Sequence, residues 1–317
     1  MRRFTPTPSL VYEHSVFSND MLRLRAPAKL NLYLRVLAER PDGYHEIETL
    51  FERIDLADEL ACRADATLSL TCSDPTLSCG EDNLVLRAAR LLQQDTSTRQ
   101  GAAIHLLKRI PIAAGLGGAS SDAASTLVGL NRLWDLGVPT ARLAELGAAV
   151  GSDVPFFLQP EEFAIGRGRG ERCEPLTAPA LAHVLVIPEE RLSTAEVYAG
   201  TQLRLTAPAP SITIVQHALR NGSLCELAEG LWNDLEPEAI RRCPVIVTIH
   251  ARLRDLGCLG ARMSGSGTAV FGLCRDPGHA EEVARQLRCQ PGHAGWRVEV
   301  VQTSKAARGS GAVVNGE

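Results

Sequence analysis

A glycine-rich run that passes directly into a helical pattern constrains the fold of this chain more than any other feature. The run spans residues 111–124 and carries three glycines within four positions, followed by two serines. Such glycines permit a left-handed backbone and let backbone N–H groups approach an anion. The serines are predicted N-caps of a helix over residues 120–136. A loop at a helix N-terminus favours phosphate, and the alternative is a tight turn between packed elements.

Length and charge limit the classes of function. The chain has 317 residues, which is long for one hydrophobic core and predicts two domains. A net charge of −4 argues against non-specific binding of nucleic acid. No apolar run approaches the roughly 20 residues that a membrane-spanning helix needs. We therefore expect no nucleic-acid partner and no membrane partner.

Cysteine usage predicts a cytoplasmic location. The nine cysteines are spread along the chain without a Cys-x-x-Cys pair, which is typical of reduced thiols and not of disulfides or a zinc site. The N-terminal residues lack a continuous apolar stretch, so residues 1–21 are expected to form a flexible extension and not a signal peptide. A flexible tail is expected over residues 304–317.

Alternating apolar residues predict that the ordered chain begins with a half-buried strand over residues 21–37. Leu30, Leu32 and Leu34 share one face, so Lys29 and Asn31 project together from the other. Further strands in the first half are predicted at residues 47–56, 59–62, 67–72 and 102–110. Helices are predicted at residues 84–92, with a cap within residues 81–83, and at residues 120–136 and 140–150.

The second half mixes short strands and helices in the same way. A glycine-rich hairpin or loop is predicted at residues 166–170, and we place the domain boundary just before it, giving domains of residues 22–162 and 163–303. Strands are predicted at residues 183–187, 258–263, 268–274 and 296–301. Helices are predicted from residue 194, at residues 212–219, 224–231 and 280–287, and as one long helix from Pro237 toward residue 256. The pattern favours an α+β fold.

Four polar residues outside the glycine-rich run are candidates for chemistry: Lys29, Asn31, His45 and Asp153. Taken singly, each is more often a solvated lysine, a strand-edge amide, a surface histidine or a turn aspartate. Beside a phosphate-binding loop, they supply a cation and a carboxylate for an acceptor hydroxyl, which phosphoryl transfer requires.

Three separated segments resemble the GHMP small-molecule kinases: residues 26–32, the run at 111–124, and residues 263–270. Three more, at residues 41–46, 81–85 and 151–156, resemble the branch whose acceptor is a cytidine diphosphate-linked methylerythritol of non-mevalonate isoprenoid biosynthesis. The resemblance covers residues 22–301. It implies the two-domain GHMP kinase architecture, with an N-terminal ribosomal-S5-like domain and a C-terminal ferredoxin-like α/β domain.

The resemblance also implies roles for individual residues. Asp153 matches the general base, and Lys29 matches the residue that holds this base and the developing charge. The implied cofactors are ATP and the Mg²⁺ that it carries, bound by Pro111, Ala113, Ala114, Gly115, Leu116, Gly117, Gly118, Ala119, Ser120 and Ser121. The acceptor is expected at Asn31, Tyr44, His45, Asp153, Tyr198, Gly265 and Gly267, the two glycines also supporting the loop. A monomer or weak homodimer is expected.

The chain departs from the family pattern at the start of the loop. Ala113, Ala114 and Ala119 stand where many relatives carry glycine, and alanine disfavours a positive φ. The first turn must therefore form without glycine, and Asp122 is assigned no role. Two other functions fit part of the pattern: a GHMP kinase with a different acceptor, which the Tyr44-His45 pair disfavours, and a noncatalytic binding module, which the acidic net charge disfavours.

Overall fold

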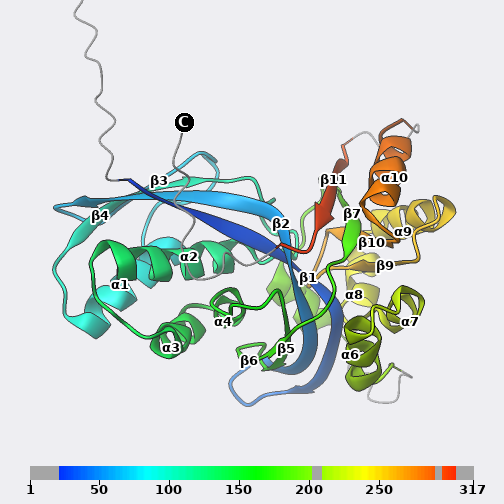
Figure 1. Ribbon diagram of the computed structural model, residues 1–317, viewed down its shortest axis with the longest axis horizontal. Helices are drawn as coiled ribbons and strands as arrows, with labels where there is room; N and C mark the ends of the chain where they lie inside the picture. The colour runs from blue at the N-terminus through cyan, green and yellow to red at the C-terminus, as the bar shows by residue number, and fades with distance from the viewer. Residues whose placement is uncertain (1–20, 202–208, 290–294, 305–317) are drawn as a thin grey trace, which may run out of the picture.

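The computed structural model describes residues 21–201, 209–289 and 295–304. The predicted N-terminal extension and C-terminal tail lie almost wholly outside these residues. Two sheets organise the chain, and the helices pack against them in two groups (Figure 1). Within the described residues, no helix has the length and apolar character needed to cross a membrane.

The first sheet is built on two long antiparallel strands, β1 (Leu22–Glu39) and β2 (His45–Asp65). Its order is β3-β4-β2-β1-β8, with β5 paired to β2 and β6 paired to β5. The bounds of the shorter strands are Ser69–Cys72 for β3, Gly101–Leu107 for β4, Phe163–Gly168 for β5, Arg172–Leu176 for β6 and Trp232–Asn233 for β8.

Two predictions about these strands were wrong. The strands expected at residues 47–56 and 59–62 are one continuous strand, because Ala57 and Asp58 keep their pairing with β1 across the predicted break. The central part of β1 is also buried on both faces and not on one: Lys29 is 4% exposed and Tyr33 is fully buried. Two loops cover the face that was expected to meet water: a Cβ on Gly117 of the glycine-rich loop would lie 2.9 Å from Cγ of Lys29, and a Cβ on Gly265 would lie 3.0 Å from its Nζ.

Four helices lie together on one side of the first sheet (Figure 1). They are α1 (Leu84–Thr96), α2 (Gly118–Leu133), α3 (Thr140–Val150) and α4 (Val154–Phe157). The predicted cap of the first helix is confirmed, because the Asn83 side chain accepts the Val85 N–H at 2.9 Å. Leu127 and Leu130 of α2 are fully buried against β1, β2 and α1. This packing holds the N-terminus of α2 beside the centre of β1, where a Cβ on the N-cap Gly117 would lie 2.9 Å from Cγ of Lys29.

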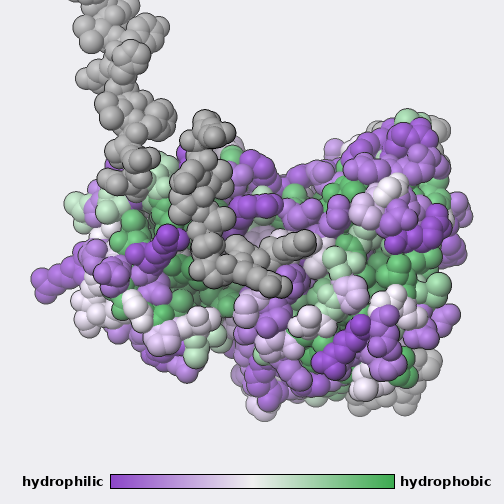
Figure 2. Space-filling model, in the orientation of Figure 1, coloured by the Kyte–Doolittle hydropathy of each residue, from purple (hydrophilic) through white to green (hydrophobic). Residues whose placement is uncertain are grey.

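The second sheet is antiparallel, with the order β11-β7-β10-β9. Its strands are β7 (Ala182–Ile187), β9 (Gly260–Met263), β10 (Val270–Cys274) and β11 (Arg297–Gln302). Helices α9 (Val245–Asp255) and α10 (Pro277–Cys289) lie beside it, away from the first group of helices (Figure 1). Hydrophilic side chains cover most of the visible face around these two helices (Figure 2).

The remaining helices are α5 (Thr194–Gly200), α6 (Ile212–Arg220), α7 (Leu224–Gly230) and α8 (Glu236–Arg242). The single long helix predicted from Pro237 is wrong, since α8 ends at Arg242 and α9 begins at Val245. Pro244 has no N–H to donate to the preceding turn, and its ring disfavours a helical residue before it. The break therefore falls at the proline.

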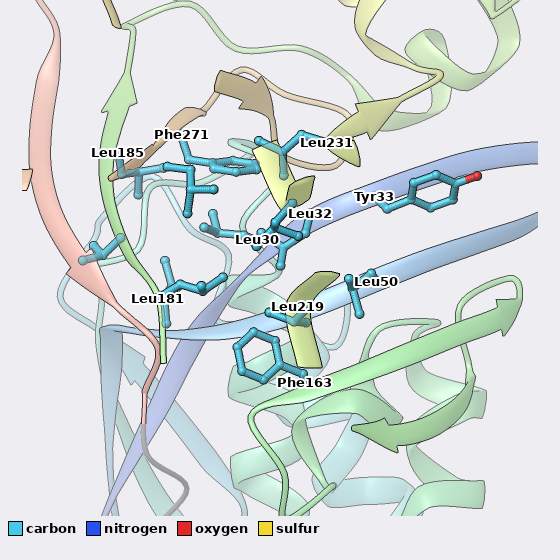
Figure 3. Close-up of a cluster of buried hydrophobic side chains, with 14 of the residues drawn as sticks. Leu30, Leu32, Tyr33, Leu50, Phe163, Leu181, Leu185, Leu219, Leu231 and Phe271 are labelled. Atoms are coloured by element: carbon cyan, nitrogen blue, oxygen red, sulfur yellow. The ribbon is translucent and has the colours of Figure 1, made fainter. Parts of the chain in front are cut away.

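A hydrophobic core joins the two sheets. Leu30 and Leu32 of β1 lie among Leu185, Phe271 and Leu231 of the second half (Figure 3). The predicted boundary before residue 163 falls inside the first sheet, because β5 pairs with β2 from Phe163 onward. The glycine-rich segment expected there forms the β5–β6 hairpin. We therefore place the division between the two sheets after β6.

Candidate functional site

A cavity of about 1170 Å³ opens where β1, the start of α2 and the loop between β9 and β10 meet. Most of the residues singled out in the sequence line it: Lys29, Asn31, Tyr44, His45, Asp153, Tyr198, Gly265, Pro111, Ala113, Ala114, Gly115, Leu116, Gly117, Gly118, Ala119 and Ser120. Two do not. Ser121 is completely buried, and Gly267 is absent from the cavity wall although its neighbour Ser266 lines it.

Lys29 and Asp153 meet in this cavity. The Lys29 Nζ lies 3.7 Å from Oδ2 of Asp153, and the two side chains are 4% and 28% exposed. Lys29 comes from the buried centre of β1, and Asp153 from the turn that immediately precedes α4. Burial lowers the pKa of the Lys29 ammonium below its usual range, and Asp153 partly offsets that shift. A carboxylate that water can reach therefore stands against a cation that water cannot reach.

Asn31 holds the Lys29 ammonium in place. The Lys29 Nζ donates to Oδ1 of Asn31, whose own Nδ2 donates to Oγ1 of Thr49 at 2.8 Å. The Thr49 hydroxyl in turn donates to the Tyr33 carbonyl oxygen at 2.6 Å. The predicted projection of Lys29 and Asn31 from one face of β1 is confirmed by their direct contact.

The glycine-rich loop is fastened from both sides. The Lys29 N–H donates to the Leu116 carbonyl oxygen at 2.9 Å. From the other side, the Ser264 hydroxyl donates to the Gly115 carbonyl oxygen at 3.0 Å. Gly115 has φ of 76°, and a Cβ built on it would lie 2.0 Å from the Ser264 carbonyl oxygen. Glycine is therefore required here by both conformation and space.

The helix after the loop begins earlier than predicted. Its N-cap is Gly117, with φ of 69°, and α2 starts at Gly118. Ser120 and Ser121 were expected to be N-caps, and this is wrong: both lie inside the first turn, where the Ser121 N–H bonds to the Gly117 carbonyl oxygen at 2.9 Å. The backbone N–H groups at the start of α2, and not capping hydroxyls, face the cavity at this point.

The first turn of the loop forms without glycine, as its sequence requires. Ala113 adopts φ of 56°, in the left-handed region that alanine disfavours. Ala114 is buried, and its carbonyl oxygen accepts the Ala269 N–H at 3.2 Å. The loop therefore keeps its shape with a strained alanine at residue 113.

Aromatic side chains line the end of the cavity beyond Asp153. Tyr44 is 51% exposed, and the ring of His45 lies 5.1 Å from the ring of Tyr198, centroid to centroid. His45 begins β2, and Tyr198 comes from α5, whose N-cap Ser193 accepts the Glu196 N–H at 3.4 Å. Burial raises the pKa of the Tyr198 hydroxyl. These rings are suited to a flat heterocyclic base.

Comparison with known proteins agrees with this geometry. Residues 83–160 match the family model for the GHMP kinases N terminal domain, and residues 215–294 match the model for the GHMP kinases C terminal. A 4-diphosphocytidyl-2-C-methyl-D-erythritol kinase of Pelotomaculum thermopropionicum is 45% identical over 266 residues, which cover 83% of this chain and 92% of that protein. The kinase of the same name from Gloeobacter violaceus is 41% identical over 279 residues, which cover 86% of this chain and 91% of that protein.

The chain belongs to the 4-diphosphocytidyl-2-C-methyl-D-erythritol kinases, a family within the GHMP kinases.

Solved structures place this GHMP kinase in the same fold. A crystal structure of 4-(cytidine 5'-diphospho)-2C-methyl-D-erythritol kinase is similar with a TM-score of 0.75 and 38% identity, covering 89% of this chain and 100% of that chain. A homoserine kinase from Cytophaga hutchinsonii has a TM-score of 0.72 at 18% identity, covering 90% of this chain and 95% of that chain, which shows the shared fold. The predicted two-domain α+β architecture of the GHMP kinases is confirmed.

A buried charge cluster beside the loop of this GHMP kinase was missed in the sequence. The Lys108 Nζ pairs with Asp58 and lies 2.8 Å from Oδ2 of Asp122. Oδ1 of Asp58 also accepts the N–H groups of Arg109 and Ile110, at 2.5 and 2.8 Å. The signal that could have revealed the cluster is a charged residue inside an apolar strand, at Asp58, and another in an apolar helix face, at Asp122.

The cluster predicts an unusual dependence of stability on pH. Burial and the neighbouring Asp58 raise the pKa of Asp122 to about 7, against the pull of Lys108. Between about pH 4 and pH 7 the folded state therefore holds a proton that the unfolded chain has lost, so stability falls as pH rises through this window. Asp122→Asn is expected to flatten that fall, which urea unfolding at pH 5, 6, 7 and 8 measures.

Asp58→Asn is the matched control for this experiment. Its Oδ2 pairs with the buried Lys108 ammonium, and an amide at residue 58 would turn an NH₂ donor toward that cation, so this variant is expected to destabilise the fold at every pH tested. A difference between Asp122→Asn and the native chain that stays constant from pH 5 to pH 8 would contradict the titration of Asp122.

Proposed function

We propose that this chain transfers the γ-phosphate of ATP to the 2-hydroxyl of 4-diphosphocytidyl-2-C-methyl-D-erythritol, giving the 2-phosphate and ADP, in non-mevalonate isoprenoid biosynthesis. The observation that carries the proposal is the placement of the Lys29–Asp153 pair in one cavity between the glycine-rich loop and the Tyr44, His45 and Tyr198 rings. The relatives that match this chain over most of their own length are named 4-diphosphocytidyl-2-C-methyl-D-erythritol kinase, which supports the same acceptor.

Asp153 acts as the general base in this proposal. Its carboxylate is exposed to the cavity and takes the proton of the acceptor 2-hydroxyl as that oxygen attacks phosphorus. Lys29, held by Asn31, orients Asp153 and stabilises the negative charge that develops on the transferred group. Phosphoryl transfer depends mainly on such positioning and charge stabilisation, so few groups are needed.

The glycine-rich loop binds the phosphates of ATP in this proposal. Gly115, Gly117 and Gly118 bring backbone without side chains to the cavity wall, and the start of α2 directs its free N–H groups and its positive dipole end there. Ser120 adds a hydroxyl at the cavity wall. Gly265 and Gly267 act by keeping the 264–268 loop against the glycine-rich loop, where the Ser264 bond to Gly115 supports this role.

We infer that Mg²⁺ enters with ATP. In the described parts of the chain, no group of three His, Cys, Asp or Glu side chains is arranged to hold a metal ion. Mg²⁺ commonly binds through substrate phosphates and retained waters, and this mode fits a cavity lined by backbone N–H groups and hydroxyls. When bound, the ion neutralises charge on the phosphates.

The acceptor occupies the opposite end of the cavity in this proposal. Tyr44, His45 and Tyr198 receive the cytosine, while Asn31 and Asp153 face the methylerythritol. A cytoplasmic location is proposed with this function, supported by free thiols at all nine cysteines, of which Cys79, Cys225 and Cys289 are exposed.

The experiment that tests the function is ADP release measured with three acceptors. We expect release with 4-diphosphocytidyl-2-C-methyl-D-erythritol and none above background with mevalonate or homoserine. His45→Ala is expected to raise the KM of the cytidine-linked acceptor by about 10-fold with an unchanged KM for ATP. Acceptor-independent ADP release, or an acceptor KM that His45→Ala leaves unchanged, would contradict the proposal.

A further inference from the structure

The proposed reaction brings two polyanions into one cavity, because both ATP and the cytidine-linked acceptor carry phosphoanhydrides. Within the described residues, four cationic side chains line this cavity: Lys29, Lys108, Arg169 and Arg191. Binding of a phosphoanhydride is favoured by a nearby cationic side chain whose donors are free to bond to the phosphate oxygens. The hydrogen bonds and ion pairs that these four side chains already form within the protein therefore decide which of them can bind the diphosphate of the acceptor.

The two lysines are already committed to protein groups. Lys29 bonds to Asn31 and pairs with Asp153, and it is almost completely buried. Lys108 pairs with Asp58 and Asp122 and is 7% exposed. Breaking either arrangement would leave a buried charge without its partner, which is costly.

Arg169 is differently placed. It lies at the turn of the β5–β6 hairpin, with its guanidinium carbon 4.7 Å from the centroid of the Tyr44 ring. Its hydrogen bond to the Ala148 carbonyl oxygen is long, at 3.4 Å, and it forms no ion pair with any residue that the structure describes. Hydrogen bonding from Arg40 lowers the pKa of Asp42 and the charge of Arg169 contributes, but the Asp42 carboxylate forms its ion pair with Arg40, at 3.2 Å. The guanidinium therefore keeps most of its donors available.

The hairpin places Arg169 at the acceptor end of the cavity. The next residue, Gly170, is so close to the proposed base that a Cβ on it would lie 3.6 Å from Oδ1 of Asp153. Arg191 is exposed and lines both this cavity and a second one behind the loop, together with Lys108, Pro111 and Ile112. Arg191 therefore stands on the nucleotide side, and Arg169 between the Tyr44 ring and Asp153.

We infer that Arg169 binds the diphosphate of the acceptor and so helps to select a nucleoside diphosphate-linked alcohol over a simple alcohol. This inference rests on the proposed function and adds a residue to it. A guanidinium can donate to two phosphate oxygens at once while its plane rests on an aromatic ring. The positions of Tyr44, Arg169 and Asp153 thereby fix the distance between the cytosine and the reacting hydroxyl of an acceptor that fits the cavity.

Two arginines of the same hairpin provide matched controls. Arg172 pairs with Glu46 at 2.9 Å, and Arg167 pairs with Glu174 at 3.2 Å. Both are exposed, and neither lines the cavity. Arg172→Gln removes the same charge from the same hairpin without touching the cavity, so it reports on any general effect of charge or hairpin stability.

The test is isothermal titration calorimetry with CDP and with cytidine on the full chain. For Arg169→Gln we expect the Kd of CDP to rise by about 10- to 100-fold, the range for losing hydrogen bonds to a charged group, and the Kd of cytidine to change less than about threefold. Arg169→Lys is expected to recover part of the loss, because it restores the charge without the planar fork. Arg172→Gln is expected to bind both ligands as the native chain does.

Steady-state kinetics give a second readout. Arg169→Gln is expected to raise the KM of the acceptor by a factor similar to that for CDP, with kcat within about threefold and the KM of ATP unchanged. Equal weakening of CDP and cytidine would show that Arg169 acts only by supporting the Tyr44 ring, and would overturn the inference. Unchanged CDP binding in Arg169→Gln would overturn it as well. Calorimetry needs no turnover, so failure of the native chain to release ADP would count against the proposed function separately.

Discussion

Replacing Asp153 by asparagine is expected to lower kcat by about 10³-fold, within the range of about 10²–10⁴ typical of a positioned general base. The amide cannot take the proton of the acceptor hydroxyl, yet it keeps the size of the side chain and can still face Lys29. Because Asp153 stands at the acceptor end, the Kd of ATP is expected to stay within about twofold of the native value. Single-turnover kinetics and an ATP-binding titration measure the two effects.

Asp135→Asn makes the same chemical change outside the cavity and serves as the control. Asp135 is exposed beyond the end of α2 and has φ of 51°, a conformation that asparagine tolerates well. We expect native kcat and stability for this variant. Retention of more than a tenth of native kcat in Asp153→Asn, or loss of ATP binding along with turnover, would contradict the role of Asp153 as base.

Gly115→Ala is expected to lower the free energy of unfolding by about 3 kcal/mol and to raise the KM of ATP by at least about 10-fold. The new Cβ would lie 2.0 Å from the Ser264 carbonyl oxygen at a φ of 76°. Neither group belongs to a flexible side chain, so the glycine-rich loop and the 264–268 loop must move apart. Urea unfolding measures the first effect, and initial rates over a range of ATP concentrations measure the second.

Two other variants separate the cost of a positive φ at a non-glycine residue from the cost of the steric clash between the new Cβ and the Ser264 carbonyl oxygen. Gly137 has φ of 64°, and a Cβ added to it would meet no atom within 4 Å, so Gly137→Ala is expected to cost only about 1 kcal/mol, from the backbone alone. Ala113 has φ of 56°, so Ala113→Gly is expected to stabilise the fold by up to about 1 kcal/mol. A loss in Gly115→Ala no greater than that in Gly137→Ala would refute the predicted collision.

Elements whose signals are local were predictable from the sequence. The Asn83 cap and the β5–β6 hairpin depend on a few consecutive residues, and both occur as predicted. Predictions failed where a distant partner changes the cost of a local conformation. A gap was predicted between the strands at residues 47–56 and 59–62, but the pairing of Asp58 with Lys108 and with two backbone N–H groups makes a charged residue acceptable inside one continuous strand.

The candidate site divides in the same way. The alternation in β1 predicted that Lys29 and Asn31 share a face, and their hydrogen bond agrees. The basic cluster of Arg167, Arg169 and Arg172 indicated a solvated or ligand-facing loop, but the sequence did not assign Arg169 to the site. Its placement arises from a contact with Tyr44, which lies on another strand connection more than a hundred positions earlier in the chain. Spacing within a segment says nothing about which other segment will pack against it.

The sequence by itself determined that a glycine-rich loop would enter a helix N-terminus, because a positive φ and small volume are properties of the residues at Gly115 and Gly117 themselves. Only the tertiary structure decided what that loop would face. The Ser264 hydroxyl that fastens Gly115 comes from 149 positions away, and the Lys29–Asp153 pair spans two elements of the first half. Those contacts depend on burial summed over both sheets, a free energy that no single segment contains.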